Sequence, residues 1–190
     1  MKKNFPGTLF LVVGNSGSGK DSIIYGTEKK YPPDLKKIRI VKRFITREPD
    51  ETEENYCITE EEFKYMEKIG KFALKWHIYQ LDYGVPIEID NWLKNGHPVL
   101  VNVSRTIVDD AREKYENIKV VFIEVPFETT LQRVTDRGRE SGEFLDMRVE
   151  RARANQKFPD ADFVVDNSGD LDDAINQFLN YVLKVVNENE

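Results

Sequence analysis

The sequence predicts an α/β fold in which a central parallel sheet is covered by helices in three layers. Short apolar runs rich in β-branched residues alternate with helical patterns along the chain. Several of these runs are continuously apolar, which is typical of strands buried on both faces of a parallel sheet. No repeat or linker interrupts the pattern, and 190 residues suit one domain. We therefore expect a single domain over residues 1–190.

The first half of the chain supplies the opening strand–helix pair. The apolar run Thr8–Val13 predicts a buried strand, and the segment Gly19–Lys30 predicts a helix that ends before a Tyr-Pro-Pro sequence. Ile38–Phe44 has the composition of a second strand. Amphipathic spacing then predicts helices over Glu60–Gly70 and Pro86–Lys94.

The second half repeats the alternation. Val99–Val103 predicts another buried strand, and Ser104 can cap the helix that follows it. Lys119–Val125 and Ala161–Val165 predict further strands, the first of them followed by a helix. Leu171–Val186 carries apolar residues at helical spacing, so we expect the chain to end in an amphipathic helix.

Composition excludes several classes of protein. Hydrophobic residues make up 39% and charged residues 33%, a balance typical of globular chains, and no apolar run is long enough to span a bilayer. A net charge of −6 argues against broad attraction to nucleic acid or to an anionic membrane. The single cysteine, Cys57, cannot form an internal disulfide, and we expect a partly buried thiol. No signal peptide is recognisable, so the sequence predicts a cytoplasmic protein, either a monomer or a homodimer.

A glycine-rich segment between the first strand and the first helix carries the strongest functional signal. It matches the G-x-x-x-x-G-K part of the Walker A motif in the context that the motif requires. Glycines allow successive backbone N–H groups to point at phosphate oxygens, and Lys20 can reach the β- and γ-phosphates. The residues expected to bind ATP are Gly14, Asn15, Ser16, Gly17, Ser18, Gly19, Lys20, Asp21 and Ser22.

The motif normally ends in Ser or Thr, whose hydroxyl binds Mg²⁺, but Asp21 stands at that position here. An aspartate oxygen is an adequate Mg²⁺ ligand, directly or through water, and we expect Asp21 to hold the metal. The alternative is a simple favourable charge at the N-terminus of the helix.

An enzyme that transfers a phosphoryl group needs a second anion site for the acceptor. Arg43 and Arg47 leave the end of an expected strand and can form paired hydrogen bonds with phosphate oxygens. Salt bridges with the acidic segment that follows are the alternative.

A second arginine cluster begins at Arg133 and Arg137, which share one helix face. Gly138 and Gly142 interrupt the helix, and Arg148 follows. Such a segment suits a lid over residues 137–150 that closes on the triphosphate. A solvated basic helix is the alternative.

Several strings together resemble the guanylate kinase-like branch of the nucleoside monophosphate kinases, and within it the ribose 1,5-bisphosphate phosphokinases. They are GNSGSGKDS, RFITRE, ENYCITEEEF, FALKWH, YGVPIEIDNWL, VLVNVSR, DRGRE and RVERA, and they reach from the first strand to beyond residue 150. The GKDS ending is a feature of the phosphokinase group. The resemblance implies a P-loop kinase fold with an acceptor-binding insertion at about residues 38–92 and an arginine-rich lid.

Guanylate kinases read guanine with a glutamate and an aspartate, and here the matching positions hold Leu74 and Ser104. Leu74 cannot accept hydrogen bonds from a base, whereas the phosphate-binding arginines persist. The resemblance therefore implies an acceptor with phosphates and a sugar but no base, namely ribose 1,5-bisphosphate phosphorylated by ATP to 5-phosphoribosyl 1-diphosphate. A guanylate kinase or other nucleotide kinase, and a non-catalytic guanylate kinase-like binding module, are the alternatives.

The resemblance also implies individual roles. The catalytic residues would be Lys20, Arg137 and Arg148. Arg133 would join the lid arginines at ATP, and Asn167 would lie near the adenine. The residues that would bind the acceptor are Arg43, Arg47, Tyr56, His77, Tyr83, Asn102, Ser104 and Arg105. Of these, His77 has the weakest assignment, because a histidine in such a position is more commonly an ordinary core or surface residue.

Overall fold

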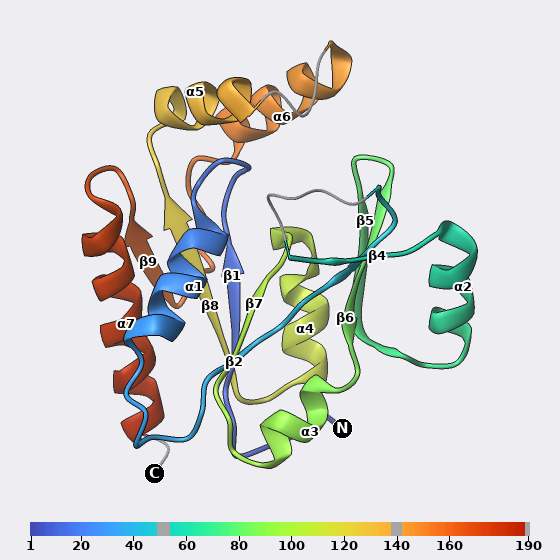
Figure 1. Ribbon diagram of the computed structural model, residues 1–190, viewed down its shortest axis with the longest axis vertical. Coiled ribbons are helices and arrows are strands. Elements are labelled where there is room, and N and C mark those ends of the chain that lie inside the picture. Colours follow the sequence, from blue (N-terminus) through green and yellow to red (C-terminus); the bar gives the residue numbers. More distant parts are fainter. Residues whose placement is uncertain (49–53, 138–141, 189–190) are drawn as a thin grey trace. The chain divides into compact units, whose positions relative to one another are not determined.

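A five-stranded sheet in the order β2-β7-β1-β8-β9 forms the centre of the fold in the computed structural model, which describes residues 1–48, 54–137 and 142–188 (Figure 1). Its first strand, β1 (Leu9–Val13), is fully buried along its whole length. In this sheet β2 pairs with β7 and β8 pairs with β9, and both pairs are parallel. The predicted α/β fold with a central parallel sheet is therefore confirmed.

The chain divides into two compact units, and β1 contributes residues to both. The first unit comprises Met1–Leu11 and Pro33–Ile118, and the second comprises Val12–Pro32 and Lys119–Glu190.

In the first unit, β2 (Arg39–Ile40) pairs with β7 (Val99–Asn102). This unit also contains the helical segments α3 (Ile89–Lys94), η1 (Arg105–Ile107) and α4 (Val108–Lys114). Ser104 caps η1 by accepting a hydrogen bond from the Thr106 N–H at 3.3 Å, as expected for a serine at a helix start.

The first unit also holds a four-stranded sheet in the order β4-β3-β6-β5. Its strands are β3 (Phe44–Ile45), β4 (Tyr56–Cys57), β5 (Phe72–Ile78) and β6 (Leu81–Pro86). Helix α2 (Glu60–Lys68) starts with a capping box, in which Thr59 and Glu62 satisfy each other's backbone N–H groups. Phe63 of this helix stacks on Phe72 of β5 at 4.5 Å between ring centroids, which fixes α2 against the sheet.

Two sequence predictions were wrong in this unit. Ile38–Phe44 is not one strand, because the chain pairs with β7 over β2 and then, from Phe44, with β6 of the other sheet. The expected helix Pro86–Lys94 begins only at Ile89, because Pro86 is the last residue of β6. The β5–β6 hairpin was not predicted at all.

Apart from its first residue, β8 (Ile118–Glu124) belongs to the second unit, where it pairs with β9 (Phe163–Asp166). The described part of this unit also contains four helices. These are α1 (Lys20–Lys30), α5 (Phe127–Arg137), α6 (Glu143–Ala154) and α7 (Leu171–Glu188). Helix α1 packs on α7, and Lys30 pairs with Asp172 across them at 2.5 Å. No described helix has both the length and the apolar character needed to cross a membrane.

Candidate active site

The phosphate loop joins β1 to α1 within the second unit. Gly17 and Gly19 have φ angles of 77° and 87°, the left-handed region that favours glycine. A Cβ on Gly19 would also lie 2.6 Å from Nδ2 of Asn167. Glycine is therefore required at position 19 for both conformation and space.

Lys20 folds back over the loop that precedes it. Its Nζ donates hydrogen bonds to the carbonyl oxygens of Gly14 and Asn15, both at 2.9 Å. The ammonium group is thus held at the loop's own backbone, with three donors available to exchange onto phosphate oxygens. This placement suits the role expected of the Walker A lysine.

Asn167 also contacts the loop and is 2% exposed. Its Nδ2 donates to the carbonyl oxygen of Ser18 at 2.8 Å. The hydroxyl and the backbone N–H of Ser168 hold the pKa of Asp166, the residue before Asn167, below its usual range. The side chain of Asn167 therefore supports the loop backbone, and its expected contact with adenine stays a prediction.

Two of the expected arginines contact the phosphate loop. Arg148 of α6 donates from Nη1 to the Ser16 hydroxyl at 2.8 Å, and Arg133 of α5 donates to the Gly17 carbonyl at 3.4 Å. The side chain of Arg137 and residues 138–141 lie outside the described residues, so the catalytic role expected of Arg137 and the first part of the expected lid stay predictions. The loop thus has cations from two helices beside it, as bound phosphates require.

The first turn of α1 carries the carboxylate of Asp21, followed by Ser22. A carboxylate with a neighbouring hydroxyl, directly after a phosphate loop, is an oxygen donor set that fits Mg²⁺. Among the described residues, no group of three or more His, Cys, Asp or Glu side chains is arranged around a common metal position. The residues present fit a metal that takes most of its other ligands from phosphates and water.

The expected acceptor residues lie in the first unit. Arg43 is 8% exposed, donates from Nε to Asn55 Oδ1 at 3.2 Å, and lies with its guanidinium 5.9 Å from the Tyr83 ring centre. Tyr83 stacks on Trp76 with nearly parallel rings 5.1 Å apart. The structure therefore brings Arg43 and Tyr83 together on one face of the four-stranded sheet.

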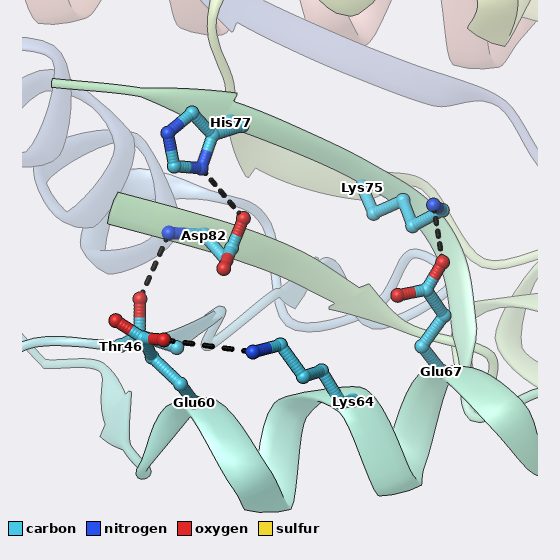
Figure 2. A network of polar contacts seen from close by, with 7 residues as sticks. All are labelled: Thr46, Glu60, Lys64, Glu67, Lys75, His77 and Asp82. Carbon is cyan, nitrogen blue, oxygen red and sulfur yellow. Dashed lines mark hydrogen bonds and ion pairs between the residues drawn. The ribbon is translucent and has the colours of Figure 1, made fainter. Parts of the chain in front are cut away.

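Tyr56 and His77 lie on the opposite face of that sheet. Tyr56 packs on Phe44, with ring centroids 4.9 Å apart. Phe44 and Ile45 are neighbours in β3, so their side chains point to opposite faces of the sheet. Since Ile45 is the register partner of Tyr83, Phe44 and Tyr56 lie on the face opposite Tyr83. His77 follows Trp76 in β5 and pairs through Nδ1 with Asp82 at 2.7 Å (Figure 2). The structure does not bring these two side chains to the Arg43–Tyr83 face, so their roles at the acceptor stay predictions.

Thr46 was not singled out from the sequence. Its hydroxyl accepts a hydrogen bond from the Asp82 N–H at 2.8 Å (Figure 2), and its own N–H donates to the Asp82 carbonyl at 3.1 Å. This double attachment fixes the chain directly before Arg47. No spacing motif signals such a contact, because it depends on the β3–β6 register.

The remaining expected acceptor residues lie at the end of β7 and directly after it. Asn102 is 9% exposed, and Ser104 accepts hydrogen bonds from both the N–H and the hydroxyl of Thr106. Arg105 opens η1, which packs against β5. Leu74 of that strand is fully buried opposite Val85. Its side chain is therefore closed to any ligand by packing as well as by chemistry.

The comparisons with known proteins agree with this arrangement. A model of the guanylate kinase family matches residues 7–185. A protein of Pseudomonas paraeruginosa named ribose 1,5-bisphosphate phosphokinase PhnN is 38% identical over 175 residues, which cover 91% of this chain and 94% of the relative. A protein of the same name from Rhodopseudomonas palustris is 37% identical, covering 87% of this chain and 82% of the relative.

Among solved structures, the guanylate kinase of Anaplasma phagocytophilum superposes with a TM-score of 0.68 at 17% identity, covering 97% of this chain and 88% of the other. At that identity the likeness shows the fold alone. The family match and the curated relatives show that this chain is a phosphotransferase of the guanylate kinase family, in the branch that contains the ribose 1,5-bisphosphate phosphokinases.

Proposed function

We propose that the enzyme transfers the γ-phosphoryl group of ATP to ribose 1,5-bisphosphate, giving ADP and 5-phosphoribosyl 1-diphosphate. The bond between the γ-phosphorus and the β–γ bridging oxygen breaks, and a bond forms to an oxygen of the acceptor's 1-phosphate. The burial of Leu74 carries the choice of acceptor, because the position that would read a base is packed inside the first unit. The names of the curated relatives support the same choice.

On the donor side, the loop N–H groups and Lys20 bind the β- and γ-phosphates. Arg148 and Arg133 start from contacts with Ser16 and Gly17, and from there they neutralise charge on the transferred group. Asp21 holds Mg²⁺, which when bound neutralises charge between the β- and γ-phosphates.

On the acceptor side, Arg43 and Arg47 bind phosphate, and Tyr83 holds the Arg43 guanidinium in place through its ring. The attacking oxygen belongs to a phosphate that is already ionised at neutral pH, so no general base is required. Catalysis then rests on alignment and charge neutralisation. We also propose a cytoplasmic location, where ATP is available.

Guanylate kinase activity is the second candidate, because the family match and the superposed bacterial enzyme carry that name. It would need a base-reading site built from residues other than Leu74. A non-catalytic binding module is disfavoured, since such a module has no use for a lysine and two arginines at an intact phosphate loop.

The test is ADP release with ATP and Mg²⁺, offering ribose 1,5-bisphosphate and GMP in separate reactions. The proposal predicts turnover with the sugar and little with GMP, and loss of both in Lys20→Ala with an unchanged circular dichroism spectrum. Turnover with GMP alone would establish the guanylate kinase instead. Failure to bind ATP would revive the binding module.

A further inference from the structure

The C-terminal end of α6 is capped by a side chain from the phosphate loop. The last carbonyl groups of a helix have no partner inside the helix. Nδ2 of Asn15 donates to the carbonyl oxygens of Ala152 and Asn155, at 3.2 and 3.1 Å. Asn155 itself caps the same end locally, donating from Nδ2 to the Arg151 carbonyl at 2.7 Å. The helix end is therefore closed by one local amide and one amide from the loop.

A second contact joins the same two elements one helical turn away. Arg148 precedes Ala152 by four residues, so both lie on one face of α6. Arg148 donates to Ser16, the loop residue that follows Asn15. Two attachments a turn apart fix both the rotation of the helix about its axis and its position along that axis.

We infer that Asn15 is a positioning residue for phosphoryl transfer, acting through Arg148 on α6. The inference rests on the proposed function, in which the Arg148 guanidinium neutralises charge on the transferred phosphoryl group. Asn15 sets where that guanidinium lies by holding the helix end to the loop on which the phosphates sit. A substitution at this position removes the side-chain amide but retains the backbone N–H.

Because the side chain of Asn15 holds α6 and its backbone belongs to the phosphate loop, Asn15→Ala should show a specific kinetic pattern. The loop backbone still binds ATP, so the KM for ATP changes by no more than about twofold, whereas kcat falls about tenfold because Arg148 is displaced. Asn155→Ala is the matched control. This substitution removes an amide cap from the same helix end but leaves the hydrogen bond from Asn15 Nδ2 to the carbonyl oxygen of residue 155. The kcat of this variant should therefore stay near that of the wild type.

A double-mutant cycle with Arg148→Ala makes the test sharper. If Asn15 acts through Arg148, Asn15→Ala has little further effect on kcat in the Arg148→Ala background. Full additivity of the two changes would overturn the inference, and so would an unchanged kcat in Asn15→Ala.

Amide hydrogen exchange without substrates tests the attachment independently of turnover. Asn15→Ala should speed exchange along α6 from about the turn that carries Arg148 to its end, whereas Asn155→Ala affects only the last turn. Wild-type exchange in Asn15→Ala would refute the attachment even in an active enzyme. If the wild type does not phosphorylate the sugar, the proposed function fails, but the exchange result still decides the attachment.

Discussion

At the scale of single residues, the two halves of the expected site differ in how far the sequence predicted them. Lys20 lies over the backbone of the phosphate loop, because the Walker A spacing dictates a local loop conformation, and its contact with phosphate stays a prediction. Tyr83 and His77 were both expected to bind the acceptor, but they lie on opposite faces of a hairpin. Which face a side chain takes depends on a register that a linear motif does not encode.

Arg47→Ala tests the assignment of acceptor residues. Since we propose that Arg47 binds an acceptor phosphate, its loss should raise the KM for ribose 1,5-bisphosphate about tenfold or more and change the KM for ATP little. Initial-rate kinetics with each substrate varied in turn separates the two. A dominant effect on ATP would mean that the donor and acceptor assignments are inverted.

Leu74→Glu tests whether the base-reading position is accessible. Because Leu74 is fully buried, a glutamate there should destabilise the fold by roughly 3–5 kcal/mol and create no activity towards GMP. Denaturant unfolding measures the loss, and Leu74→Met serves as a control that conserves volume. A stable variant that phosphorylates GMP would show that the site reaches this position.

At the scale of elements, strong periodic or buried segments were predicted and the β5–β6 hairpin was not. Its turn residues, Tyr79 and Gln80, both have positive φ angles, 53° and 60°, as a type I′ turn needs. Asn-Gly or Asp-Gly usually marks such turns. With Tyr and Gln there, the segment has no turn signal, and the conformation is imposed by cross-strand pairs such as Trp76 with Tyr83.

Lys3, near the N-terminus, is held in the first unit by a pair of buried side chains, Tyr115 and Asp90, which the sequence also did not predict. Tyr115 is 2% exposed, and its hydroxyl donates to Asp90 Oδ1 at 2.6 Å. Lys3 pairs with the other oxygen of Asp90, also at 2.6 Å. Burial, followed by the hydrogen bond to Asp90, raises the pKa of Tyr115 far above its usual range.

This pKa shift predicts an alkaline loss of stability. The folded state holds the phenol proton more tightly than the unfolded chain, whose tyrosine ionises near pH 10. The stabilisation is therefore complete below about pH 10 and is lost as the pH rises above it. Tyr115→Phe should be less stable at neutral pH by about 1–3 kcal/mol, because Asp90 loses a partner, and should lose less stability on going to alkaline pH.

Urea unfolding of the wild type and the variant at neutral and alkaline pH measures this difference. Tyr65→Phe is the control, since Tyr65 is 64% exposed and should change neither value. Parallel pH profiles for the wild type and Tyr115→Phe would contradict the account.

At the scale of the whole molecule, the residues expected to bind ATP and those expected to bind the phosphoryl acceptor fall in different structural units. All of the expected ATP-binding positions fall in Val12–Pro32 and Lys119–Glu190, and all of the expected acceptor positions fall in Pro33–Ile118. The sequence alone predicted a single domain with an insertion and did not show this partition, because the units interleave along the chain. Long-range pairing, rather than local propensity, decides which segments share a unit.

The partition predicts how each ligand protects the protein from hydrogen exchange. A non-hydrolysable ATP analogue should slow exchange first in the phosphate loop and in α1, α5 and α6, and ribose 1,5-bisphosphate alone should slow it in the segments that hold Arg43 and Arg47. GMP in place of the sugar is the control and should protect little. Protection of the phosphate loop by the sugar alone would contradict the separation.

The most direct test of the central claim is a competition in one reaction containing ATP, Mg²⁺ and equal concentrations of ribose 1,5-bisphosphate and GMP. The ratio of the two products then gives the ratio of the kcat/KM values. The account predicts an excess of 5-phosphoribosyl 1-diphosphate over GDP of at least about a hundredfold. An excess of GDP would contradict it, and would mean that the enzyme reads guanine without using the position of Leu74.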